Sequence, residues 1–304
     1  MRYTDRSTNQ PGYPLSTRTA VNWAQCEQGF RTSLELPPCP AEHIIVPSLS
    51  MTGTPYCFQF SLRDEQNQAW QLNSVPAQTA APAVPTDAPV TTHIDAWHTT
   101  RDLGASVLDV IVDRQPLDFL LTVSVRPLTI EPANTHAQVS LTRCPLPISQ
   151  MQAPENIRHG ICSPTSMAML VDRPGRQGWL DLVAECRDQV TGMYGVWPLA
   201  IRAAAMAGRL GAVEVFSGWS DVMPALDAGH PVVASIRFAE GALPGAPLNK
   251  TGGHLVVVYG IEKEQVLVLD PAAPDHDSVA RRYDIKAFSR AWFAHRGAGY
   301  ILAA

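Results

Sequence analysis

The sequence predicts a protein in two parts, an all-β sandwich followed by an α+β domain. Residues 30–145 contain short apolar stretches that alternate with polar residues and are separated by turn-forming residues. Near residue 146 the pattern changes to helical segments followed by strongly apolar strands, which is typical of a helical lobe plus an antiparallel sheet. We therefore expect a flexible N-terminal arm over 1–29, a β-sandwich accessory domain over 30–145 and an α+β domain over 146–304.

Length and composition fit one large or two ordinary globular domains. The chain has 304 residues, 45% of them hydrophobic, and a formal net charge of −5. This charge gives no reason to expect nucleic acid or an anionic membrane surface as a partner. The sequence shows no signal peptide and no apolar run of about 18 residues. We expect a cytoplasmic protein, while a trimmed leader, another secretion route and the oligomeric state stay open.

The first half contains one group of residues with chemical potential. Its strands are predicted at 32–36, 43–46, 56–62, 70–72, 93–98, 107–112 and 119–125, with a long Pro/Ala/Thr-rich surface loop over 74–90. On the strand at 93–98, His93 and Asp95 would share one face, while His98 would face the other way. We interpret these three as exposed polar residues of the sandwich and not as a metal or catalytic site.

In the second half, helices are predicted at 178–186, 199–208, 220–228 and 286–293, after a short helix that starts beside Cys162. Strands are predicted at 213–216, 231–238, 253–261, 264–271 and 299–302. A thiol at a helix N-terminus feels the positive end of the helix dipole, which stabilises the thiolate. Pro164 suits the first turn of such a helix. Taken alone, a cysteine of this kind is more often a buried structural residue.

A nucleophilic thiol needs a base, and the base needs an acceptor that orients it. His254 begins an apolar strand, and Asp270 ends the next strand just before Pro271. The two strands, joined by a turn at 262–264, would run antiparallel and return Asp270 to the level of His254. A carboxylate on one imidazole nitrogen fixes the tautomer and leaves the other nitrogen facing the cysteine.

Residues 146–302 resemble papain-like cysteine peptidases of the bacteriocin-processing, or double-glycine-leader, type, and most of all the soluble bacterial relatives without a transporter. Six ordered blocks carry the resemblance: PISQ (147–150), ICSPTSMAM (161–169), YGVWP (194–198), GHPVVASI (229–236), GHLVVV (253–258) and VLDPA (268–272). The resemblance implies a papain-like fold, with Cys162 as nucleophile, His254 as general base and acid, and Asp270 as the residue that orients the imidazole.

The resemblance also implies an upstream glutamine whose side-chain amide helps to hold the oxyanion. Gln150 fits this role by its Ser-Gln context, but it precedes Cys162 by a longer interval than is usual in the group. Gln152 and Asn156 therefore stay open as substitutes. Ser163 takes the place of the commoner glycine after the cysteine.

We expect a cysteine peptidase or amidohydrolase that cleaves peptide or amide bonds of a peptide or protein substrate through a thioester acyl-enzyme. Two alternatives stay open. One is acyl transfer to an amine, as in a transglutaminase, on the same residues. The other is a binding module in which the peptidase domain is inactive and the β-sandwich acts.

No cofactor or metal is expected. The six cysteines (Cys26, Cys39, Cys57, Cys144, Cys162 and Cys186) form no C-x-x-C pair, and we interpret them as mostly free thiols. His159 is interpreted as a loop histidine, and the run Asp275-His276-Asp277 as a solvated turn. Trp197 is the tryptophan expected to line the cleft.

Overall fold

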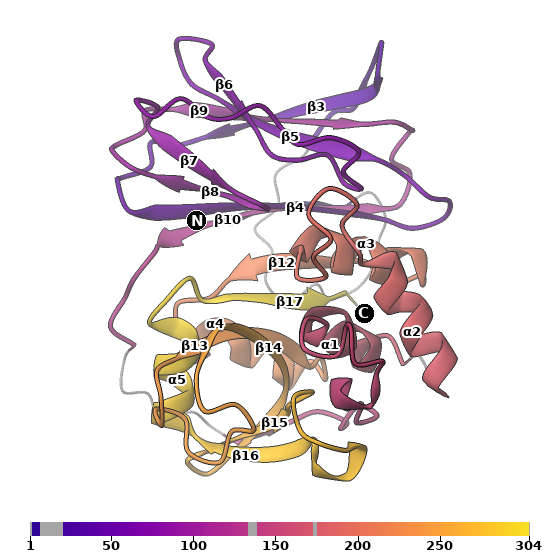
Figure 1. Ribbon diagram of the computed structural model, residues 1–304. Coiled ribbons are helices and arrows are strands. Elements are labelled where there is room, and N and C mark those ends of the chain that lie inside the picture. The colour runs from indigo at the N-terminus through magenta and orange to yellow at the C-terminus, as the bar shows by residue number, and fades with distance from the viewer. Residues whose placement is uncertain (1, 7–20, 133–138, 173–174, 304) are drawn as a thin grey trace.

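The computed structural model consists of strand-rich layers, and its described helices lie in the second half of the chain (Figure 1). The structure describes residues 2–6, 21–132, 139–172 and 175–303. Within these ranges the strands form three sheets, and all of the neighbouring strands pair antiparallel. In the same ranges, no helix combines the length and the apolar character that are needed to cross a membrane.

Two five-stranded sheets make up most of the first half. The first follows the order β1-β10-β4-β8-β7, with bounds Arg2–Arg6, Phe119–Pro127, His43–Met51, Ala96–Thr99 and Val90–His93. The second follows the order β2-β3-β9-β5-β6, with bounds Ala24–Cys26, Gly29–Leu36, Ser106–Val112, Phe58–Arg63 and Ala69–Gln71. Both sheets contribute to one apolar core. On β5, for example, the alternate residues Phe58, Phe60 and Leu62 are buried, while their neighbours are partly exposed.

The first sheet is buried on both faces. On β4, Ile45 and Leu49 pack in the core shared with the second sheet. The alternating residues Ile44 and Val46 belong to a different core, which they share with helices of the second half. The hydroxyl of Ser50, on the same strand, donates to the Gly211 carbonyl and accepts from its N–H. These contacts satisfy backbone groups at a sheet edge of the second half, so the first sheet lies between the second sheet and that half.

The third sheet holds the second half together. Its strand order is β12-β17-β13-β14-β15-β16, with β11 also paired to β14. The bounds are β12 Gly211–Val215, β17 Ala298–Leu302, β13 Val232–Phe238, β14 Thr251–Glu262, β15 Gln265–Leu269, β16 Ala280–Asp284 and β11 Ser140–Leu141. The helices are α1 Cys162–Leu170, α2 Gly175–Glu185, α3 Trp197–Met206, α4 Trp219–Asp227 and α5 Ile285–Phe293, with short 3-10 turns η1 Gln150–Gln152 and η2 His276–Ser278.

Helices cover both faces of this sheet, and the continuous apolar character of its strands follows from that arrangement. On β14, Val256 and Val258 pack with residues of α4 and α5, whereas Leu255 and Val257 pack with residues of α1, α2 and α3. In Figure 1 the sheet curves strongly, with α5 and α1 on opposite sides of it. The α+β composition predicted for the second half is confirmed, with α1–α3 preceding most of the sheet.

Strand pairings cross two of the expected segment boundaries. The arm expected over 1–29 contains β1, which pairs with β10, and β2, which pairs with β3; residues 7–20 of this arm lie outside the described residues. The strand β11 lies before the boundary expected at 146, yet it pairs with β14 of the third sheet. Both pairings join short segments to strands that are distant in the sequence, so no local periodicity could indicate them.

Candidate active site

Cys162 is the first residue of α1, and its thiol is partly exposed. The preceding Ile161 has no side chain that could cap the helix. The N–H groups of the first turn are therefore not occupied by a capping side chain, and they point towards the cysteine end of the helix. The backbone groups of Ser163 and Leu255 both form hydrogen bonds with the sulfur. A thiol so placed is surrounded by donors that favour its ionised form.

Hydroxyl groups along α1 fix this helix against its neighbours. The Ser166 hydroxyl donates to the Leu255 carbonyl of β14 at 3.1 Å, directly beside His254. The hydroxyl of Ser163 lies 2.8 Å from the Tyr300 hydroxyl of β17. Both hydroxyls are buried, so each contact holds the start of α1 in a defined place relative to the sheet. Ser163 thus has a structural role in this chain.

The hairpin of β14 and β15 brings His254 and Asp270 together as the sequence predicted. The register pairs Val258 with Val268 and Val257 with Leu269, which places Asp270 at the edge of the sheet where His254 lies. His254 Nε2 is 2.8 Å from Asp270 Oδ1, and the two side chains are 4% and 1% exposed. With Nε2 directed at the carboxylate, Nδ1 is the ring nitrogen left for the hydrogen bond between His254 and the Cys162 thiol.

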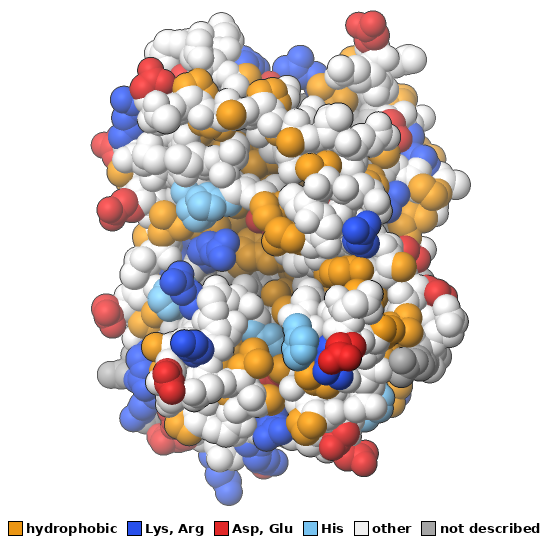
Figure 2. Space-filling view, in the orientation of Figure 1, with side chains coloured by type: hydrophobic (Ala, Val, Ile, Leu, Met, Phe, Trp, Pro, Cys, Tyr) orange, Lys and Arg blue, Asp and Glu red, His pale blue; other side chains and the backbone are white. Residues whose placement is uncertain are grey.

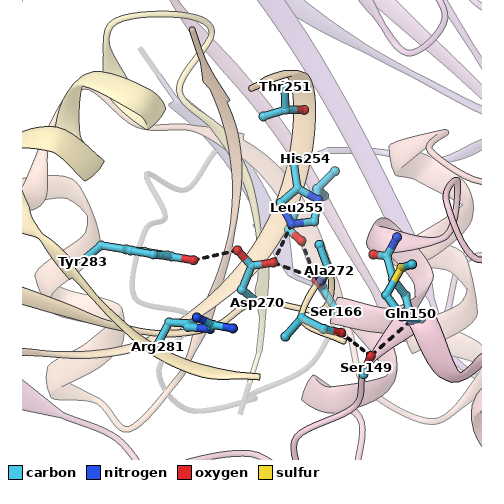
Figure 3. A network of polar contacts seen from close by, with 12 residues as sticks. Ser149, Gln150, Ser166, Thr251, His254, Leu255, Asp270, Ala272, Arg281 and Tyr283 are labelled. Atoms are coloured by element: carbon cyan, nitrogen blue, oxygen red, sulfur yellow. Dashed lines mark hydrogen bonds and ion pairs between the residues drawn. The ribbon is translucent and has the colours of Figure 1, made fainter. Parts of the chain in front are cut away.

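Tyr283, which the sequence reasoning missed, completes the support of the carboxylate. Its hydroxyl donates to Asp270 Oδ2 at 2.7 Å, while the Ala272 N–H donates to Oδ1 at 3.0 Å. Figure 3 shows His254 and Tyr283 on opposite sides of the Asp270 carboxylate. Tyr283 comes from β16, which pairs with β15. The available signal was this third strand of the meander: Tyr283 pairs with Val266, and its side chain extends along the sheet to reach Asp270.

The ionisation of the three groups is strongly linked. Burial raises the pKa of the Cys162 thiol, but the hydrogen bond and the charge of His254 outweigh it, so the pKa is lowered overall. Burial alone would lower the pKa of His254, whereas the charge and hydrogen bond of Asp270 raise it to about 10. Burial would likewise raise the pKa of Asp270, but His254 and the Tyr283 hydroxyl lower it. All three directions favour a thiolate–imidazolium pair beside a carboxylate.

Gln150 lies close to the group formed by Cys162, His254 and Asp270, since its backbone N–H donates to the Pro271 carbonyl at 2.8 Å. Its side chain is buried; Nε2 donates to the Arg158 carbonyl at 2.6 Å. Among the described residues, Oε1 of Gln150 has no hydrogen-bond partner. Gln152 and Asn156, the two substitutes, are both exposed, and the Gln152 amide donates to the Pro274 carbonyl. Of the three candidates, Gln150 is the one enclosed beside the Asp270–Pro271 turn.

A cleft of about 510 Å³ opens beside Cys162. One side is formed by the loop that connects α2 and α3 and by Trp197, which lines the cleft as the sequence predicted. Figure 2 shows a hollow between the upper and lower halves of the face drawn, with a hydrophobic floor and His, Lys and Arg side chains gathered along one side. The residues that line the cleft are His93, Ile94, Asp95, His159, Gly160, Cys162, Gly192, Met193, Tyr194, Gly195, Trp197, Ser235, Gly253, Leu255 and Arg296.

The first half of the chain supplies one wall of this cleft, and there the sequence interpretation was wrong. Residues 93–98 do not form one strand, because β7 ends at His93 and β8 begins at Ala96, with a two-residue turn between them. His93 and His98 are consequently diagonal neighbours across a hairpin, with ring centroids 3.7 Å apart. Asp95 is buried, and its carboxylate accepts a hydrogen bond from the backbone N–H of Trp197 at 3.1 Å.

Other candidate residues have modest roles. His159 is exposed and lines the cleft near Cys162. In the run at 275–277, Asp275 caps η2, and His276 Nδ1 accepts a hydrogen bond from the Ser149 N–H. Within the described ranges, no three His, Cys, Asp or Glu side chains come together in a way that could hold a metal ion. The six cysteines are all described and all free.

Comparison with known proteins identifies the family. Residues 146–300, about half of the chain, match the profile described as the Peptidase_C39 like family. The chain belongs to this family. No curated protein matches it. Among solved structures, it is similar to a Bacillus anthracis protein described as a candidate C39-like peptidase, with 16% identity, a TM-score of 0.42, and coverage of 55% of this chain and 98% of that one.

Proposed function

We propose that the protein is a cysteine peptidase or amidohydrolase in which Cys162 is the nucleophile, His254 the general acid and base, and Asp270 the residue that orients the imidazole. One observation carries this proposal: the Cys162 thiol, the His254 ring and the Asp270 carboxylate form a continuous chain of hydrogen bonds, and the thiol opens into a cleft. Family membership supports the same reaction class, because C39-like proteins are grouped as peptidases.

In the first step the Cys162 thiolate attacks the carbonyl carbon of a peptide or amide bond, and the carbonyl oxygen takes up the negative charge. The His254 imidazolium then gives its Nδ1 proton to the leaving nitrogen, and the C–N bond breaks. The products are a thioester on Cys162 and a free amine. Asp270 stays ionised throughout, since its carboxylate accepts from Nε2, from Tyr283 and from the Ala272 N–H.

In the second step a water molecule attacks the thioester, and His254 takes one of its protons. Collapse of this intermediate breaks the C–S bond, releases the carboxylic acid and returns the proton and the charge to the thiolate–imidazolium pair. Oxyanion stabilisation is assigned to the Cys162 N–H and to the side-chain amide of Gln150, whose second amide hydrogen is not used by the Arg158 carbonyl. Each such donor contributes about 3–4 kcal/mol to the barrier reduction.

In the proposed division of the chain, the first half has a supporting role in this reaction. Residues 30–145 act as a β-sandwich accessory domain that supplies the His93–Asp95 wall of the cleft, and residues 146–304 act as the papain-like peptidase domain. The substrate is a peptide or protein, and the reaction needs no cofactor. The contact between Asp95 and the Trp197 N–H couples the accessory wall to the helix that lines the cleft.

Cleavage of a random-sequence peptide mixture, analysed by mass spectrometry, tests the proposal. The wild-type protein is expected to produce new peptide termini and, in the presence of hydroxylamine, peptidyl hydroxamates from the trapped thioester. Cys162→Ala is expected to lower the rate by at least about 10⁴-fold, because it removes the nucleophile. Cys144→Ala is the matched control, since this exposed thiol lies outside the cleft. Equal cleavage by Cys162→Ala and wild type would contradict the proposal.

A further inference from the structure

Arg296 lies in the same cleft as Cys162. Arg296 follows α5, and its guanidinium carbon lies 5.3 Å from the centre of the Trp197 ring. In the described part of the chain, no carboxylate lies within ion-pair distance of Arg296. Stacking on an indole restrains a guanidinium while it leaves the N–H edges free. The side chain is therefore held in the cleft with its donors available.

A second cation extends the positive charge along this side. Arg237 of β13 is exposed, and it lies two residues beyond Ser235, which lines the cleft. Residues two apart on a strand point to the same side, so Arg237 lies towards the cleft rim. Both arginines contribute to lowering the pKa of His295, which burial lowers most, so their charges reach the same small region. A cleft that carries charge of one sign attracts the opposite charge in a substrate.

The other groups near Arg296 neutralise the positive charge only in part. His93 and His98 face it from the β7–β8 hairpin; burial lowers the pKa of both, and the charge of Arg296 lowers it further. They are therefore neutral donors and acceptors. Asp95 is the nearby acid; its carboxylate accepts from the Trp197 backbone N–H, and burial raises its pKa to about 6, so that near pH 7 it offsets one of the two arginine charges. The net character of this side of the cleft is cationic.

Exposed apolar side chains also line the cleft. The loop between α2 and α3 contributes Met193, whose surface is 44% exposed, and Tyr194. Ile94, at the tip of the β7–β8 hairpin, is 37% exposed. Apolar side chains with this much exposure inside a cleft are suited to contact an apolar part of a ligand. A substrate that fits both the arginines and these apolar residues carries an apolar segment and a negative charge.

We propose that Arg296, with Arg237 beside it, forms a specificity subsite for a carboxylate group of the substrate peptide. The group is either the side chain of an aspartate or glutamate near the scissile bond, or the C-terminal carboxylate of a short peptide. A guanidinium binds either one through two parallel N–H···O bonds. This inference rests on the proposed function, because it assigns the choice of substrate to the cleft in which Cys162 reacts.

A synthetic peptide library distinguishes the two sources of the carboxylate. Each sequence is made with a free and with an amidated C-terminus, and internal Asp and Glu are compared with Asn and Gln at every position. For the wild-type protein, kcat/KM is expected to be about ten- to a hundredfold higher for one acidic set than for its amide counterpart. Arg296→Gln is expected to remove this preference, while Arg296→Lys retains part of it.

Arg290→Gln is the matched control, because Arg290 is an exposed arginine of α5 that does not line the cleft. It is expected to keep the full preference. Acidic and amide peptides cleaved equally well by the wild-type protein, or a preference unchanged in Arg296→Gln, would overturn the subsite while leaving the proposed peptidase intact.

Binding is measured separately from turnover by protection of Cys162 from iodoacetamide. Acidic peptides are expected to protect Cys162 at lower concentrations than their amides in the wild-type protein, but not in Arg296→Gln. This comparison does not require cleavage. If no peptide is cleaved but selective protection is seen, the proposed function fails and the subsite stands. Equal protection by acidic and amide peptides contradicts the subsite whatever the turnover.

Discussion

Two histidine sites with opposite electrostatics lie beside the cleft. On the peptidase side, His254 is buried against Asp270, and the carboxylate raises its pKa to about 10. On the opposite wall, His98 stacks on His93 near Arg296, and burial together with these neighbours lowers its pKa to about 3. Both histidines belong to antiparallel hairpins. The difference shows that the neighbouring charge, and not the residue type or local structure, decides which histidine is protonated.

Replacing the carboxylate is the most direct way to weaken this contrast. In Asp270→Asn the amide oxygen can still accept from His254 Nε2, so the orientation of the ring is largely kept while the charge is lost. We expect kcat/KM to fall by roughly 10²- to 10⁴-fold.

The pH profile of the same variant shows whether the decrease in kcat/KM comes from the changed ionisation of His254. The imidazolium loses the carboxylate that stabilises it, so the alkaline limb is expected to move to lower pH by about 1–3 units. Steady-state kinetics across pH measure both effects. An unchanged alkaline limb would show that Asp270 does not set the ionisation of His254.

Tyr283→Phe is expected to have a smaller effect on the same group. It removes the hydrogen bond to Asp270 Oδ2 and leaves one lone pair of a buried carboxylate without a partner. We expect a loss of stability of about 1–3 kcal/mol and a small decrease in kcat/KM. Urea unfolding and kinetics measure the two. Tyr259→Phe, on the same sheet but away from Asp270, is the control, and equal effects of both variants would contradict the role of Tyr283.

The β14–β15 hairpin, the helix that begins at Cys162 and the approach of Cys162 to His254 could be predicted from the sequence. Two apolar strands separated by a short turn force His254 and Asp270 to one edge, and the helix signal after Cys162 is local. Tyr283 could not be predicted with the same certainty, since its role depends on how a third strand pairs with β15. The same holds for Gln150, because its neighbours, the Arg158 and Pro271 carbonyls, come from loops.

The wall formed by the first half was misjudged for a related reason. Residues 93–98 read as a continuous strand because nothing in Ile94-Asp95 is a strong turn signal. The turn is stabilised by tertiary contacts, among them the hydrogen bond from the Trp197 N–H to Asp95. Alternation within one segment cannot indicate such a contact, and so neither the pairing of His93 with His98 nor the place of His93 in the cleft was expected.

The smallest expected effect concerns the pH dependence of stability, where the two histidines act in opposite directions. The folded-state pKa of His98 lies below its ordinary value of 6.5, so its contribution to stability is present above pH 6.5 and is lost as the pH falls towards about 3. The folded-state pKa of His254 lies above 6.5, so its contribution is present below pH 6.5 and is lost as the pH rises towards about 10.

His98→Phe separates these contributions, because a phenyl ring retains the apolar contacts and does not titrate. We expect the free energy of unfolding of this variant to fall less steeply than that of the wild type between neutral and acidic pH, with no change on the alkaline side. Urea titrations across pH measure the difference. A steeper loss in acid for His98→Phe would contradict the assignment of a lowered pKa to His98.

The central claim, that His254 activates Cys162, is tested most directly by the rate of iodoacetamide alkylation at each cysteine as a function of pH, followed by peptide mass spectrometry. Two thiols serve as internal references: Cys144, which is exposed, and Cys186, which is buried; burial raises the pKa of both. We expect Cys162 to react fastest at and below neutral pH, and His254→Ala to move its reaction to higher pH. Cys162 reacting no faster than Cys144 near neutral pH, or reacting equally in His254→Ala, would contradict the claim.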